Sequence, residues 1–404
     1  MASTSDRATI DAVASDLDDE LIALRRDIHR WPELAGGERR TAALVAERLR
    51  AAGLTVSTGV GGHGVVAAVD GVADGPTIAY RADLDAVAGD EEFDSEFASQ
   101  VPGAAHLCGH DIHTTVGVGI AQVLAKVRHR LQGRVVFIFQ PAEETLEGAQ
   151  AMLADGVLAR AEPHEIYALH CAPLPVGTFA VMPGSGQPGL DRCHIALAGP
   201  HAEAEGARLR AEIEAWATVA YPRTPEESQQ LFTDLQTPDG PLARFVFVHS
   251  DLTTDDQQAE LRVNLRAWPD DRYPQLRADL RRLVAPVAGA RIDFPECPFP
   301  AMVCSPELSE AAATYLRDTF GSAAVVVLHA AFPFNGEDFG LFLQHVPGAM
   351  ILLGGAEPAT GHNGAPHTPD FAADERAIGV GVRAIAGLLS NRLAVLPASG
   401  AIPG

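Results

Sequence analysis

Apolar residues in the first 190 positions recur with two different spacings. Spacings of four and three residues predict an amphipathic helix that ends near Pro32. Its apolar positions are Leu17, Leu21, Leu24, Ile28 and Trp31. A second helix is expected over 40–52, with Gly53 as its terminator. Apolar runs at 65–69, 77–80, 135–139 and 166–169 predict buried strands, and 112–131 has a helical pattern. This alternation predicts an α/β layer.

The pattern changes in the middle of the chain and then returns. Six segments follow the order βαββαβ, which is typical of a ferredoxin-like module. They are 192–198, 203–217, 244–249, 259–266, 273–284 and 290–294. A helix at 306–319, strands at 325–328 and 349–353, and a helix at 374–390 resume the α/β pattern. We therefore predict a discontinuous α/β domain over 1–187 and 302–404, interrupted by a smaller domain at 188–301; the tail after 392 belongs to neither pattern.

Composition and charge narrow the classes of partner. The chain has 404 residues and 47% apolar content, enough to bury a large core. A formal net charge of −23 disfavours nucleic acid and anionic membranes, so small molecules are the expected partners. The first 20 residues lack a secretory leader, and no stretch is expected to span a membrane, which makes the cytoplasm the expected location. Five scattered cysteines do not form a disulfide framework, so one of them is free to bind a metal.

The densest chemical cluster is HLCGHDIH at 106–113, directly before the helical pattern. A thiolate and an imidazole two residues apart, Cys108 and His110, suit Zn²⁺, Mn²⁺, Co²⁺ or Ni²⁺. The adjacent carboxylate of Asp111 can orient an imidazole from behind. The alternative is a loop before a helix whose histidines are merely solvated.

A second cluster, FQPAEE at 139–144, follows the apolar run 135–139. Ligands gather at the carboxyl ends of strands in open α/β sheets. There, one of Glu143 and Glu144 can bind a metal while the other moves a proton between a water molecule and a leaving group. Taken alone, adjacent glutamates are more often surface charge.

Four further polar positions follow predicted strands or lie in loops. His170 ends the run 166–169, and His367 lies in GAPHTP at 364–369. Each is either a metal ligand or a structural histidine. Asp83 and Asp85, after the run 77–80, either support a metal site or cap a turn.

Taken in order, six segments resemble the metal-dependent aminoacylase and N-acyl amino acid amidohydrolase family, which includes hippurate hydrolases and auxin-conjugate hydrolases. The segments are RADLDA, HLCGHDIHTT, FQPAEE with the later Gly148, ALHCAP, NGEDFG and APHTPDF. The similarity covers about 20–185 and 305–391. It implies a metallopeptidase-like catalytic domain interrupted by a ferredoxin-like domain that serves as a lid and a dimerisation surface. A homodimer is thus implied.

The resemblance also implies a set of site residues. Two divalent metal ions would be held by Cys108, His110, Glu144, His170 and His367, with Cys108 bridging them. Glu143 would be the general base and acid, and His201, in GPHA, would polarise the scissile carbonyl. Asp83 and Asp111 are the expected second-shell carboxylates. The alternative for His201 is an exposed loop histidine.

The sequence departs from the family pattern at elements that hold the substrate. DAVAGD at 85–90 replaces the usual continuation of the first motif, and the acidic stretch 91–96 that follows is expected to rim the pocket. HSDLTT at 249–254 stands where an asparagine-valine-isoleucine-proline element is expected, and 203–205 lack the usual serine-x-proline. An unusual amide substrate is therefore an alternative to an ordinary acyl amino acid.

Two other functional hypotheses are kept. The first is a dipeptidase or carboxypeptidase built on the same domain, although the cysteine-glycine-histidine motif favours the aminoacylase branch. The second is a non-catalytic metal-binding relative, which would not need Glu143 beside Glu144.

Overall fold

The computed structural model describes residues 4–255 and 257–396, which divide into two compact units. Unit 1 comprises Met1–Pro183, Cys304–Val327 and Leu341–Gly404, and unit 2 comprises Gly184–Val303 and Leu328–Gly340. The expected tail after 392 lies partly outside the described residues, because the final helix continues to Val395 and the description stops at residue 396.

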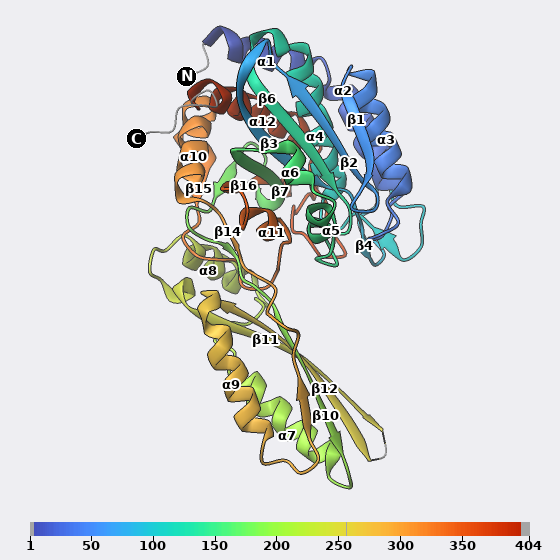
Figure 1. Ribbon diagram of the computed structural model, residues 1–404, viewed down its shortest axis with the longest axis vertical. Helices are drawn as coiled ribbons and strands as arrows, with labels where there is room; N and C mark the ends of the chain where they lie inside the picture. Colours follow the sequence, from blue (N-terminus) through green and yellow to red (C-terminus); the bar gives the residue numbers. More distant parts are fainter. Residues whose placement is uncertain (1–3, 256, 397–404) are drawn as a thin grey trace. The chain divides into compact units, whose positions relative to one another are not determined.

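The core of unit 1 is an eight-stranded mixed sheet in the order β1-β2-β6-β3-β7-β16-β8-β15 (Figure 1). In that order its strands are Thr55–Val60, Gly64–Asp70, Gln132–Gln140, Ala73–Asp83, Glu165–Pro175, Gly348–Ala356, Phe179–Val181 and Val325–Val327. A separate pair, β4 (Val87–Ala88) and β5 (Ala104–Ala105), is antiparallel. The four strands predicted in the first 190 residues are all present, each longer than its apolar run, and the α/β prediction is confirmed.

Unit 1 contains the helices α1 Thr4–Ser15, α2 Asp18–Arg30, α3 Arg39–Ala51, α4 His110–Lys126, α5 Gly148–Ala154, α6 Val157–Ala161, α10 Pro306–Phe320 and α12 Arg376–Val395. Helices α3, α4, α5, α10 and α12 contact strands of this sheet, and α1 and α2 pack on α4 and α12. The 3₁₀ turns of unit 1 are Arg128–Arg130, Ser322–Ala324 and Pro358–Thr360, and the short α11 (Phe339–Leu343) crosses the border between the two units in the sequence. Helix α2 buries Leu21, Leu24 and Ile28 as its periodicity predicts, and Gly53 terminates α3 with φ +80°.

Strand register places three of the chemical segments at one edge of the sheet. Strands β3, β6 and β7 are mutually parallel, and Asp83 of β3 pairs in register with Gln140 of β6. On the other side of β3, Arg81 pairs with Ala168 of β7, two residues before His170. His170 does not end its strand as the apolar run predicted, because β7 continues to Pro175. It nevertheless lies level with the end of β3, so the aspartates, the glutamate pair and His170 are brought together there.

Helix α12 is long and apolar enough, by length and composition, to cross a membrane, which the sequence analysis did not expect of any stretch. Its 18-residue window has a mean hydropathy of 1.3, but 61% of that window is buried inside the protein. The helix packs against α4 and against strands β3, β6 and β16. These properties are typical of the core helix of a globular domain, so α12 is weak evidence for a membrane span.

Unit 2 contains the predicted βαββαβ order. Strands β10 (Asp191–Ala198), β11 (Phe245–Asp255), β12 (Gln258–Trp268) and β13 (Arg291–Asp293) form an antiparallel sheet in the order β11-β12-β10-β13. Helices α7 (Ala202–Glu214) and α9 (Tyr273–Val284) lie side by side on one face of it (Figure 1). Along β12, buried and exposed residues alternate strictly from Gln258 to Val263, as expected of a sheet covered on one face only.

Several elements of unit 2 lie outside that order. They are the helix α8 (Pro225–Leu235), the strand pair β9 (Gly186–Gln187) and β14 (Met302–Val303), and the 3₁₀ turns Pro241–Ala243 and Asp270–Arg272. Helix α8 starts with a capping interaction in which the Thr224 side chain accepts a hydrogen bond from the Glu227 N–H. That Thr-x-x-Glu signal was present in the sequence but was not used.

The second stretch of unit 2, Leu328–Gly340, differs from the expected division, which placed all of 302–404 in the catalytic domain. The N–H of His329 donates to the carbonyl of Leu235 at 2.8 Å. Phe334 stacks on Tyr221, with ring centroids 4.4 Å apart. These long-range contacts attach the stretch to unit 2, and no local pattern in the sequence announces them.

A buried ion pair gives unit 2 a testable weak point. Arg277 of α9 binds both carboxylate oxygens of Asp191 at 2.7 and 2.8 Å, and 1% of the Asp191 side chain is exposed. Arg277→Met would leave that carboxylate buried without its partner, so we expect the free energy of unfolding to fall by about 3–5 kcal/mol. Urea unfolding monitored by circular dichroism measures this loss. The double variant Arg277→Met, Asp191→Leu should recover part of it, whereas a single variant as stable as the wild type would contradict the prediction.

Candidate metal centre

The first ligand segment turns sharply into helix α4. Gly109 has φ +86°, a conformation that favours glycine, and a Cβ added there would lie 3.1 Å from the Sγ of Cys171. This turn lies between Cys108 and His110, whose side chains are both buried. The Sγ of Cys108 is 3.4 Å from Nε2 of His170, in the middle of β7. Ligand atoms of Cys108, His110 and His170 all lie within 4.8 Å of one another.

The glutamate pair lies in a tight loop after β6. Ala142 has φ +52°, and its N–H donates to Oε1 of the buried Glu38 at 2.9 Å. The N–H of Glu144 donates to Oδ2 of Asp85 at 2.9 Å. Strained backbone held by buried carboxylates is a common property of functional loops. The loop thereby aims Glu143 and Glu144 toward His110, whose Nε2 is 3.9 Å from Glu143 Oε2 and 3.5 Å from Glu144 Oε1.

Gly148 closes this loop, and its substitution is a test of the loop's role. A Cβ at Gly148 would lie 1.6 Å from the carbonyl oxygen of Pro141, so Gly148→Ala must push the loop open. We expect kcat/KM to fall at least about 100-fold, because displacements near 1 Å cost that much in aligned sites. Steady-state kinetics measures it. Gly156→Ala is the control: its φ of +75° makes an alanine there costly to the backbone, but nothing lies within 4 Å of its Cβ, so stability changes without a clash. Equal losses of kcat/KM in the two variants would contradict the prediction.

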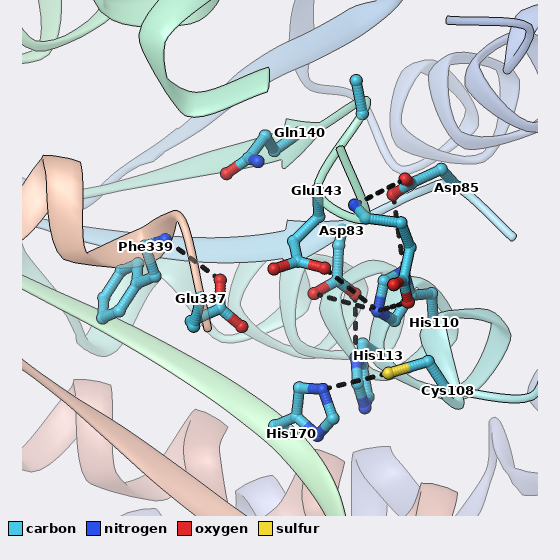
Figure 2. A network of polar contacts seen from close by, with 12 residues as sticks. Asp83, Asp85, Cys108, His110, His113, Gln140, Glu143, His170, Glu337 and Phe339 are labelled. Carbon is cyan, nitrogen blue, oxygen red and sulfur yellow. Dashed lines mark hydrogen bonds and ion pairs between the residues drawn. The ribbon is translucent and has the colours of Figure 1, made fainter. Parts of the chain in front are cut away.

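His367 approaches from a different segment. It has φ +63°, and its N–H donates to the carbonyl of Leu107 at 2.7 Å, which links its loop to the segment that carries Cys108. Its Nε2 is 3.6 Å from Glu144 Oε1. Ligand atoms of Cys108, Glu144 and His367 form a second group within 4.8 Å. The five predicted ligands are therefore brought into two groups that share Cys108, and Figure 2 shows Cys108, His170 and His110 as neighbours in this network.

Charges around His110 are predominantly negative. Burial opposes its protonation, but Asp83, Asp85 and Glu144 outweigh this effect and raise the pKa of His110 to about 10. Burial, with His110 acting in the opposite direction, raises the pKa of Glu144 to about 7. Burial and the nearby carboxylates also raise the pKa of the Cys108 thiol well above its ordinary value. Cations placed among these groups would stabilise the ionised carboxylates and the thiolate together.

The donor set fits divalent metal ions. Among the described residues, both ring nitrogens of the buried His110 and Oε1 of Glu144 lack a hydrogen-bond partner. Unpartnered buried donors and acceptors are costly unless something binds them. One thiol, three imidazoles and a carboxylate are the ligands that Zn²⁺ and neighbouring transition metals prefer.

The carboxylates expected to orient the metal ligands are not all the ones that lie beside them in the structure. Asp83 lies beside the predicted ligand His110, with Oδ2 3.8 Å from Nε2 of that ring. The carboxylate of Asp111, expected to orient a ligand imidazole, instead binds Nε of Arg25 at 2.6 Å and Nδ1 of His29 at 2.8 Å. Asp85 takes the position beside the ligand, with Oδ1 3.4 Å from Nδ1 of His110. The Asp111 carboxylate, on α4, therefore binds side chains of α2 and holds these two helices together.

Sequence reasoning missed the residues that support the loops. Arg25 and His29 are buried on α2, four residues apart beside its apolar stripe, and this spacing was the available signal. His29 also binds Oε2 of Glu91 at 2.8 Å through Nε2. Only 9% of the Glu91 side chain is exposed, so the start of the acidic stretch 91–96, which was expected to rim the pocket, is anchored inside unit 1.

His201 belongs to unit 2. It is the residue before the first turn of α7, and its side chain is exposed. No hydrogen bond or ion pair of its side chain is present among the described residues. The structure therefore leaves its predicted role as a carbonyl-polarising residue untested.

Comparisons with known proteins show the family of this chain. Residues 79–391 match peptidase family M20/M25/M40. A probable hydrolase of Synechocystis is 32% identical over 375 residues, covering 90% of this chain and 93% of the relative. N-acetylcysteine deacetylase of Bacillus subtilis is 32% identical over 365 residues, covering 89% and 93%. Thermostable carboxypeptidase 1 of Saccharolobus solfataricus is 30% identical over 393 residues, covering 91% and 94%.

A solved structure is also similar to this chain. A Bacillus subtilis protein described as a dinuclear metal binding peptidase from the M20 family has a TM-score of 0.73 and 29% identity, covering 95% of this chain and 100% of that one. The resemblance to metal-dependent amidohydrolases is confirmed. The chain belongs to peptidase family M20/M25/M40 and is a hydrolase of that family.

Proposed function

We propose that the protein hydrolyses the amide bond of an N-acyl amino acid or a related small amide at a pair of divalent metal ions. One observation carries this proposal: the two groups that contain the five predicted ligands share Cys108, and the loop after β6 adds the buried carboxylate of Glu143, whose oxygen lies within 4.8 Å of ligand atoms of His110 and Glu144. A site that only stored metal would not require this additional buried carboxylate. The arrangement thus supports catalysis over simple metal binding.

Cys108, His110, Glu144, His170 and His367 would hold the ions. Bound divalent metals polarise a carbonyl and lower the pKa of a water molecule. We propose Mn²⁺, Zn²⁺, Co²⁺ or Ni²⁺, because the mixed sulfur, nitrogen and oxygen donors suit this class of ion.

Glu143 is the proposed general base and acid. Its carboxylate, 95% buried, would take the proton of the attacking water and return it to the leaving amine. Asp85 and Glu38 keep the Glu143 loop in place through backbone N–H groups. We propose that His201 stabilises the negative charge that develops on the carbonyl oxygen, within a homodimer that forms through unit 2.

The amide side of the family is favoured for the substrate. N-acetylcysteine deacetylase, whose name describes removal of an acetyl group, supports an acylated amino acid. The relative named carboxypeptidase supports the alternative that a peptide bond is cut. A net charge of −23 disfavours nucleic acid and anionic membranes as partners, so a small molecule is the proposed partner. We also propose a cytoplasmic location.

A substrate panel tests this function. We expect purified protein loaded with Mn²⁺ or Zn²⁺ to release amines from N-acetyl and N-benzoyl amino acids at least about tenfold faster, in kcat/KM, than from dipeptides, since pockets of different shape and polarity separate substrates by this much or more. The same panel should include amides without a free α-carboxylate. Amine release followed by mass spectrometry is the measurement.

Each outcome of the panel separates the alternatives. Preference for dipeptides would replace the proposal by a peptidase function. Preference for amides lacking the carboxylate would support the unusual-substrate hypothesis raised by 85–90 and 249–254. Tight binding of two metal ions without any turnover would support a non-catalytic relative.

A further inference from the structure

His113 is a buried histidine beside the metal ligands, with a hydrogen-bond partner at each ring nitrogen. It lies three residues after His110 on α4, and its side chain is fully buried. Its Nδ1 is 2.8 Å from Oδ1 of Asp83, and its Nε2 is 2.8 Å from the backbone nitrogen of Cys171. A backbone N–H can only donate, so Nε2 is the acceptor and the ring proton is on Nδ1, where it is donated to Asp83.

The Cys171 backbone connects this histidine to a predicted ligand. Its N–H is bound by His113, and its carbonyl oxygen is 2.8 Å from Nδ1 of His170. His170 therefore carries its proton on Nδ1 and presents an unprotonated Nε2, the atom 3.4 Å from the Sγ of Cys108. Metal-binding histidines commonly donate their second ring N–H to a carbonyl in this way. His113 thus restrains the backbone that orients His170.

Asp83 anchors the other side of His113. Its Oδ2 binds Nη1 of Arg81 at 2.6 Å, and Nε of Arg81 donates to Oε1 of Gln140 at 2.8 Å. These groups lie at the aligned ends of β3 and β6, and Figure 2 shows Asp83 in contact with both His110 and His113. One hydrogen-bonded series therefore runs from the ends of β3 and β6, through His113, to the predicted ligand His170 within β7.

An alternative is that His113 itself binds metal, because ligand atoms of Asp83, His110 and His113 also lie within 4.8 Å of one another. Coordination through Nε2 would leave the buried Cys171 N–H without its acceptor, and coordination through Nδ1 would break the bond to Asp83. Among the described residues, the imidazole of His110 instead has both nitrogens free of hydrogen bonds. The geometry therefore favours a supporting role for His113 over direct coordination of a metal ion by its ring.

We propose that His113 is a positioning residue that accepts the Cys171 N–H and thereby holds the His170 imidazole in its metal-binding orientation. The inference rests on the proposed two-metal function. It assigns to His113 no contact with substrate and no bond to metal.

Two variants test the two ring nitrogens of His113 separately. The amide of glutamine reaches the position of Nε2, so His113→Gln keeps an acceptor for the Cys171 N–H. The shorter amide of asparagine reaches only the position of Nδ1, so His113→Asn keeps the bond to Asp83 and loses the one to Cys171. Because loss of an outer-shell partner typically costs 10–100-fold in metal affinity, we expect His113→Asn to bind one of two Co²⁺ ions about 10–100-fold more weakly. His113→Gln should stay within a few-fold of the wild type.

Metal titration with optical detection of Co²⁺ and ¹⁵N NMR of the histidine rings provide the readouts, and circular dichroism confirms that each variant is folded. In the metal-free wild type, His113 should be protonated at Nδ1 alone, and metal should leave that state unchanged. Unaltered Co²⁺ binding by His113→Asn, equal losses in both variants, or a change of the His113 ring on metal binding would overturn this inference alone. A wild-type protein that binds no metal would overturn the proposed function and this inference with it.

Discussion

Replacing Glu143 with glutamine is expected to lower kcat by about 10²–10⁴-fold while both metal ions remain bound. Glutamine keeps the shape of the side chain but cannot accept the proton of the attacking water, and general base catalysis contributes an acceleration of this size. The loss corresponds to about 3–5 kcal/mol of transition-state stabilisation. Steady-state amine release and elemental analysis of the same preparations measure the two quantities.

Glu147 offers a matched control for Glu143. It is exposed in the same loop, and Glu147→Gln removes the same charge from the same segment. We expect this control to retain wild-type turnover. Full activity of Glu143→Gln would exclude Glu143 as the base, and loss of metal from that variant would instead indicate that Glu143 is a ligand.

Replacing Cys108 with serine is expected to weaken both metal sites. The Cys108 sulfur belongs to both ligand groups, and a serine hydroxyl does not ionise to replace a thiolate. Since a change outside the coordination sphere already costs about 10–100-fold in metal affinity, we expect a greater loss for each ion and no measurable turnover. Metal content after dialysis, and loss of the thiolate-to-Co²⁺ absorption band, are the measurements.

Cys193 provides the control for the cysteine chemistry. It is a buried thiol in the core of unit 2, and Cys193→Ala should reduce stability slightly while leaving metal content unchanged. Two tightly bound ions in Cys108→Ser would contradict the assignment of Cys108 as the shared ligand.

The sequence was sufficient for the elements and for the kinds of donor. Helix α2 and strand β3 were predictable because burial on one face or on both faces imposes a periodicity that a single segment displays. The types of ligand at 108–110 and 143–144 were likewise visible, since thiolate, imidazole and carboxylate are what divalent metals bind. The motif order then added the family, which physical pattern alone did not supply.

Only the tertiary structure decided how these donors are supported. Nothing local distinguishes Asp85, which lies beside His110, from Asp111, whose carboxylate binds Arg25 and His29 of α2. The partners of Asp111 lie 86 and 82 residues away in the sequence, and local periodicity carries no information about such pairs. The same holds for Leu328–Gly340, which joins unit 2 through contacts with Tyr221 and Leu235. Local composition therefore determined the elements and the available chemistry, whereas hydrogen-bond partners that must be found across the fold determined which side chains hold the site in place.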